Sequence, residues 1–340
     1  MGVRFERVPL ATRIARLRHR RDATSGVDAI AVIAERLAVL LSAGVPASAA
    51  WAHLGEGTAD DRPASQEVDL RAAADATVLR AAAVAAGQGE PVAAAIRVAR
   101  AATSAASPEW GVLAAAWSVA AESGAPLAAS LRDLSTALRD EAQLRREVRT
   151  ALAGPIASAR LVLSLPVIAV LFGALLGFDT VAVLLGNPLG LACVGAGGLL
   201  LWIGHRWSAS LAARASRSRA DAGLELELLA IAMSGGASID RARTVVHDAL
   251  AAQELAEADR RAADEVVALA ARAGAPVAEL LRAEAFRLRR VARAEGAARA
   301  AALGVRLMLP LGACVLPAFV LVGVVPLLIS VISATLGGAA

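Results

Sequence analysis

The side chains that most often carry out chemistry are few and scattered in this 340-residue chain. The four histidines lie in separate segments: His19, His53, His205 and His247. Each therefore fits a surface or interfacial position better than a metal site. Both cysteines, Cys193 and Cys314, lie inside apolar runs, and their spacing indicates neither a disulfide nor a metal site. We expect no bound metal.

The sequence also lacks the motifs of common enzymes. No lysine occurs, so all 35 basic residues are arginines, and P-loop and Schiff-base lysines are excluded. No HExxH, CxxC or G-x-S-x-G pattern is present. The sequence predicts a non-catalytic protein without a cofactor.

One carboxylate and a set of arginines remain as candidates for a partner interface. Glu122 precedes a glycine break, and two interpretations stay open: a buried functional carboxylate, or a satisfied carboxylate at a helix end. The candidate arginines lie on polar faces next to apolar runs: Arg132, Arg139, Arg145, Arg146, Arg282, Arg287, Arg289 and Arg290. A solvated helix face beside a membrane explains them equally well. The net charge is only +4 and no aromatic platforms accompany the arginines, so nucleic acid is not an expected partner.

The composition of the chain indicates the fold class, and so the elements that hold these residues in place. Hydrophobic residues make up 57% of the chain and charged residues 19%, and the mean hydropathy is +0.58. These values exclude a disordered chain and indicate an integral membrane protein with sizeable soluble parts. Alanine and leucine favour helices, and no alternating β-branched run competes. We predict an all-α protein.

Three apolar segments are long enough to cross a bilayer. Residues 161–178 and 181–204 predict a transmembrane hairpin, and residues 303–336 a third membrane helix with its apolar core at 303–332. Arginines flank the hairpin on both sides and its turn has none, so the positive-inside rule puts the flanks and the N-terminus in the cytoplasm and the C-terminus outside. The third helix contains three prolines that predict kinks: Pro310, Pro317 and Pro326.

Three glycines, Gly195, Gly197 and Gly198, lie inside the second predicted span. Glycine clusters also bind phosphates, but inside a membrane helix they favour close packing against another helix. We interpret them as packing positions.

The remaining segments predict two cytoplasmic helical bundles. Residues 1–26 form a basic tail, either solvated or lying as a helix on the inner leaflet, without the apolar core of a signal peptide. Residues 27–160 contain six helical segments and residues 205–302 about four. Ser107 is predicted to cap the fifth helix. The expected helix breaks are Gly44, Gly124, Pro126, Gly274 and Pro276.

The two bundles have similar sequences at two places. Residues 123–127 (SGAPL) align with residues 273–277 (AGAPV), and each segment precedes a charged helix that leads into the membrane. Residues 36–50 (RLAVLLSAGVPASAA) are similar to residues 228–242 (LLAIAMSGGASIDRA). We infer an internal duplication of a bundle-plus-membrane unit. In this register Arg272 replaces Glu122, so a role of that glutamate does not carry over to the second repeat.

At these residues the chain resembles the type II secretion system F family of inner-membrane platform proteins, and within it the platform proteins of tight-adherence (Flp) pili. The resemblance includes Leu40 to Pro46, Gly89 to Pro91, Glu122 to Gly124, Asn187 to Gly190, the SLP of the first span and the LPLGACVLPAFVLVGVVPLL tail. It implies a multi-pass platform in the cell membrane, in contact with lipid, that serves a hexameric secretion ATPase and passes pilin or pseudopilin subunits into a filament. A paralogous platform protein and a homo- or hetero-oligomer are further implied.

Two other functions stay open as alternatives. A transporter or channel subunit would need more spans and a polar residue inside the membrane. A membrane-bound enzyme would need a nucleophile with its base or a metal cluster.

Overall fold

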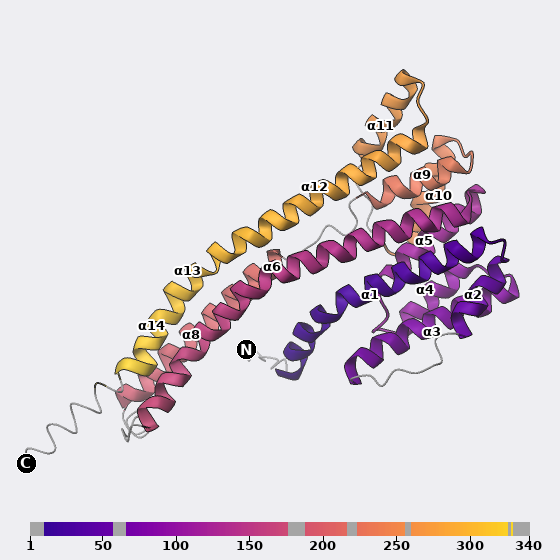
Figure 1. Ribbon diagram of the computed structural model, residues 1–340. Coiled ribbons are helices and arrows are strands. Elements are labelled where there is room, and N and C mark those ends of the chain that lie inside the picture. Colours follow the sequence, from indigo (N-terminus) through magenta and orange to yellow (C-terminus); the bar gives the residue numbers. More distant parts are fainter. Residues whose placement is uncertain are drawn as a thin grey trace, which may run out of the picture. The chain divides into compact units, whose positions relative to one another are not determined.

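The computed structural model describes residues 10–56, 66–175, 188–215, 223–255, 260–325 and 328. All secondary structure in these ranges is helical, which confirms the all-α prediction. The chain divides into two compact units, one made of Met1–Arg145 and Arg219–Ala292, the other of Arg146–Ser218 and Arg293–Ala340. Two of the three boundaries between the units fall inside long helices, α6 and α12 (Figure 1).

The first repeat contributes the first helices of the chain. They are α1 (Leu10–Ser42), α2 (Ala47–Glu56), α3 (Gln66–Gln88), α4 (Val92–Ala102), α5 (Glu109–Ser123) and α6 (Leu127–Leu175). The second repeat contributes α9 (Leu224–Ser234), α10 (Ile239–Ala252), α11 (Arg260–Ala273) and α12 (Val277–Arg306). In the aligned register, α9 and α10 are the counterparts of the end of α1 and of α2, and α11 and α12 those of α5 and α6. Within the described ranges, the second repeat has no counterpart of α3 and α4.

Helices of both repeats share one hydrophobic core in the first unit. Trp51 of α2 and Trp117 of α5 meet edge to face, with ring centroids 5.3 Å apart. The other side of α5 packs on α9 and α10, so α5 is buried almost all round. Gln253, after α10, donates a hydrogen bond of 3.2 Å to the Ala93 carbonyl oxygen of α4. The expectation of two bundles is therefore not confirmed.

The second unit contains α8 (Pro188–Ala215) and the C-terminal helical stretch. That stretch consists of α13 (Met308–Pro310), the π-helix η1 (Leu311–Val315), α14 (Leu316–Phe319) and the π-helix η2 (Val320–Val324). α8 packs along it. A Cβ added to Gly197 would lie 2.2 Å from Cγ2 of Val322, and one added to Gly204 3.0 Å from Cβ of Cys314. The packing interpretation is confirmed for Gly197, whereas Gly195 and Gly198 have nothing within 4 Å of an added Cβ.

Membrane crossing is supported for one of the three predicted spans. Among the described residues, the helical stretch Val277–Val324 is long and apolar enough to cross a bilayer. The end of the first predicted span (176–178) and the start of the second (181–187) lie outside the described ranges, so the three-span topology stays a prediction. The π-helices η1 and η2 follow Pro310 and Pro317, as expected where proline removes backbone hydrogen bonds. Pro326 lies outside the described residues.

Candidate functional site: the arginine-bearing helices

Two glycine turns set the start of the helices that carry the candidate arginines. Gly124 ends α5 with φ of 72°, and Gly274 follows α11 with φ of 61°. Both angles lie in the left-handed region, which glycine adopts without a Cβ clash. Pro126 and Pro276 directly precede α6 and α12. Because the two turns match, arginines at equal spacing beyond them occupy equivalent positions in the two repeats.

One arginine forms an equivalent ion pair in each repeat. Arg139 of α6 forms an ion pair with Glu35 of α1, and Arg289 of α12 forms one with Glu227 of α9. Arg139 and Arg289 are counterparts, and in the register of residues 36–50 with 228–242 the two glutamates are counterparts as well. Each pair joins the first helix of its repeat to the last. Sequence reasoning identified the arginines but missed both glutamates.

The two pairs differ in burial. The side chains of Arg139 and Glu35 are 51% and 39% exposed, whereas those of Arg289 and Glu227 are 24% and 7% exposed. Burial raises the pKa of Glu227, although the nearby Arg289 guanidinium opposes the shift. The buried pair therefore belongs to the fold of the second repeat, and the exposed pair lies at the surface of the first.

Arg145 is also committed to internal contacts. Its Nη1 lies 2.8 Å from Oε1 of the buried Glu109, and its Nε 2.8 Å from Oε1 of Glu141. Burial alone would lower the pKa of Arg145, but the two carboxylates outweigh this effect and the pKa is raised. This arginine ties α6 to the start of α5.

The other candidate arginines of α12 differ in exposure: Arg282 is about as buried as Arg289, whereas Arg287 and Arg290 are exposed. Arg282 lies between Asp133 of α6, 3.3 Å away, and Glu279, 2.7 Å away. Arg287 donates from Nε to Glu284 at 2.7 Å, and this hydrogen bond lowers the pKa of the Glu284 carboxyl. Arg290 lies over the half-exposed ring of Phe286, 5.9 Å from its centroid. An aromatic ring beside arginines at a surface is a common composition for a protein interface.

Three further candidates lie at the surface. Arg132, Arg146 and Glu122 are all exposed. The exposure of Glu122 contradicts the interpretation of a buried functional carboxylate, because this glutamate occupies the outer side of the last turn of α5. Arg132 projects from the second turn of α6, and no ion pair of its guanidinium is found among the described residues.

A correction concerns the loop before α5. Ser107 does not cap that helix; its hydroxyl instead donates to Oδ2 of Asp75 at 2.7 Å. The Ser107 backbone N–H and Trp110 Nε1 donate to Oδ1 of the same carboxylate, at 2.8 Å and 2.9 Å. The serine is buried against α3, which takes its side chain away from the α5 backbone. Asp75 showed no sequence signal, because it is an isolated acidic residue in an alanine-rich segment.

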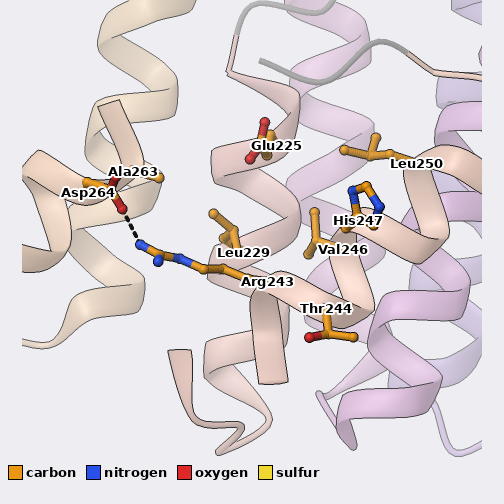
Figure 2. Close-up of a pocket in the computed structure, with 9 residues that line it drawn as sticks. All are labelled: Glu225, Leu229, Arg243, Thr244, Val246, His247, Leu250, Ala263 and Asp264. Atoms are coloured by element: carbon orange, nitrogen blue, oxygen red, sulfur yellow. Dashed lines mark hydrogen bonds and ion pairs between the residues drawn. The ribbon is translucent and has the colours of Figure 1, made fainter. Parts of the chain in front are cut away.

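One cavity, of about 400 Å³, lies between α9, α10 and α11. Its apolar wall includes Leu229, Val246 and Leu250, and the ion pair between Arg243 and Asp264 crosses from α10 to α11 (Figure 2). No group of three or more metal-ligating side chains occurs among the described residues.

Comparison with known families identifies the first repeat. Residues 33–175 match the family model for type II secretion system (T2SS), protein F. The T2SS F match begins in α1 and ends with α6, so it includes Glu122, Arg132, Arg139, Arg145 and Arg146. No curated protein and no solved structure matched the chain.

The matched T2SS F family has known general properties. Domains of this family belong to inner-membrane platform proteins of type II secretion and type IV pilus machines, which are generally non-catalytic. They generally work with a secretion ATPase and pilins.

Proposed function

We propose that this protein is the non-catalytic inner-membrane platform of a tight-adherence (Flp) pilus machine, in which it couples a cytoplasmic secretion ATPase to the insertion of pilin into the filament. The T2SS F match over residues 33–175 carries the proposal. The order of the tight-adherence motifs along both repeats supports the subtype. Pseudopilin secretion by a related machine is the neighbouring alternative.

The proposed mechanism is mechanical. The ATPase contacts exposed charged positions of α6 and α12, and its motions pass along these helices toward the apolar segments that hold the pilin helix. Arg132, Arg287 and Arg290 are suited to the contact because they are exposed. Arg145 and Arg289 are less suited, since their guanidinium groups hold buried carboxylates of the fold.

Charge reversal tests the ATPase contact. We expect Arg132→Glu combined with Arg287→Glu in the full-length protein to lower copurification of the cognate secretion ATPase about tenfold, because each exchange sets a like charge against an acidic partner surface. Arg97→Glu, at an exposed position of α4 outside the candidate set, serves as the matched control and should copurify the ATPase normally. Undiminished copurification with the double variant would rule out this surface.

The wider assignment has its own test. Mass spectrometry of partners retained in mild detergent should find a secretion ATPase and a small pilin. Retrieval of substrate-binding or transport subunits instead would favour the transporter alternative.

A further inference from the structure

The contact between the two repeats is one-sided. α5 of the first repeat packs on α9 and α10 of the second. At the end of α5, the Ser123 carbonyl oxygen would lie 2.2 Å from a Cβ added to Gly235, in the turn between α9 and α10. If the two repeats were related by a two-fold axis, α11, the counterpart of α5, would also pack on α1 and α2, the counterparts of α9 and α10. These helices do not pack on each other in the described part of the chain. In Figure 1, α11 lies at the edge of this unit, away from α1 and α2. The contact between the two repeats is thus heterologous: each repeat uses a different surface for it.

A heterologous contact leaves one surface of each kind uncovered. On α9, Leu228 and Ile231 are fully buried. Their counterparts on α1 are Arg36, which is exposed, and Val39, which is 55% exposed. The α1 face made of Arg36 and Val39 is therefore the uncovered equivalent of a surface that is buried in the second repeat.

The complementary surface is uncovered on α11. On α5, Ala115 and Val119 are fully buried. Their counterparts on α11 are Glu265, which is exposed, and Leu269, which is 47% exposed. The cavity of Figure 2 separates part of α11 from α9 and α10, whereas α5 packs directly in the core. We call Glu265 and Leu269 the α11 face.

The two uncovered faces match each other in chemistry. Suppose that α11 of one chain packs on α1 of another chain in the way that α5 packs on α9 within one chain. Ala273 then lies near Ala43, just as Ser123 lies near Gly235. One helical turn further back, the exposed Leu269 and Val39 stand at the same level. Two turns back, Glu265 lies at the level of Arg36, so that a negative and a positive side chain face each other across the contact. Substitution of buried apolar positions by a complementary charge pair is expected at the rim of an interface between separate chains.

We propose that the α11 face of one chain docks on the α1 face (Arg36 and Val39) of a second copy of this chain, in the manner of the contact between the two repeats. The proposal does not depend on the proposed function. Because the contact is heterologous, each docked chain keeps its other face free, so copies add head to tail and close into a ring or continue as an open row.

Disulfide trapping tests the geometry in the full-length protein. Val39→Cys and Leu269→Cys are placed in separately tagged chains, in a background with Cys193→Ala and Cys314→Ala, and oxidised in membranes. We expect a cross-linked dimer from the mixture and little from either variant alone. Val98→Cys, at an exposed position of α4, replaces Val39→Cys in the control and should give about tenfold less dimer. A cross-link no stronger than this control would overturn the proposal, and so would Val39→Cys chains that dimerise with each other equally well.

A charge exchange provides an independent check in the same assay. Arg36→Glu alone or Glu265→Arg alone should lower the yield of the mixed cross-link about tenfold, because like charges then meet at the interface. A chain carrying both exchanges should recover the yield, since the pair is restored in reversed order. Single variants that cross-link as efficiently as the parent would contradict the predicted pairing, as would a double variant without recovery. Both positions are exposed, and circular dichroism of each variant confirms folding.

Discussion

The equivalent glutamate–arginine pairs of the two repeats should contribute differently to stability, because one pair is buried and the other is exposed. Glu227 and Arg289 lie largely inside the protein, where a charge without a partner is costly. Glu35 and Arg139 lie near water, which solvates each charge whether or not the other is present. The residue types are the same in both repeats, and only the surrounding atoms distinguish them.

We therefore expect unequal effects from one substitution at two equivalent positions. Arg289→Met should reduce the free energy of unfolding by about 3–5 kcal/mol, because it leaves the Glu227 carboxylate buried without its partner. Arg139→Met should cost about 0–1 kcal/mol, as is usual for an exposed pair. Thermal unfolding of the full-length protein in detergent compares the two variants directly. Equal losses of stability would show that burial does not separate the pairs.

At the scale of elements, glycines decide which helix faces can approach one another. In the second unit, α8 meets the C-terminal stretch at Gly197 and Gly204, whereas Gly195 and Gly198 face open space. Only some glycines of the GAGG run therefore contribute to packing. Helical periodicity alone does not reveal which face is used, because the partner helix lies more than a hundred residues further along the chain.

Valine substitution should distinguish these glycines. Gly197→Val inserts a branched side chain where Val322 already lies, and we expect about 1–3 kcal/mol of destabilisation from overpacking. Gly195→Val should be tolerated, because nothing lies within 4 Å of its added Cβ. The midpoint of thermal unfolding in detergent measures both. If the two variants unfold at the same temperature, the close approach of α8 at Gly197 is wrong.

For the whole first unit, the decisive contact is the one between repeats. The end of α5 lies against the α9–α10 turn, at a position where the second repeat has Gly235 and the first has Ala43. Gly235 has an ordinary φ of −80°, so backbone conformation does not require glycine there. Its lack of a side chain serves the close approach of the Ser123 carbonyl group.

Gly235→Ala should weaken the contact between the repeats. The added methyl would lie 2.2 Å from a backbone oxygen, which can retreat only if the α5 turn moves. We expect a loss of about 1–3 kcal/mol together with faster amide hydrogen exchange in α9 and at the end of α5. Gly87→Ala in α3, with nothing near its added Cβ, is the matched control and should be neutral or slightly stabilising. Unchanged exchange in Gly235→Ala would contradict this packing.

The sequence by itself determined the helical fold class, the positions of the turns at Gly44, Gly124 and Gly274, and the T2SS F resemblance. These features follow from local properties, because helix propensity, periodicity and left-handed glycines depend on neighbouring residues. It also identified the arginines of α6 and α12. It could not tell which of them face water, since that depends on what packs against each helix.

Tertiary structure alone decided the long-range partners. Glu35, Glu227 and Asp75 have no distinguishing local pattern, and their roles arise only when distant helices are brought to within hydrogen-bond distance. It also decided that α5 packs against helices of both repeats, whereas α11 lies at the edge of the unit. The physical reason is that burial and ion pairing depend on the relative register of several helices, which the short-range pattern of any one of them does not encode.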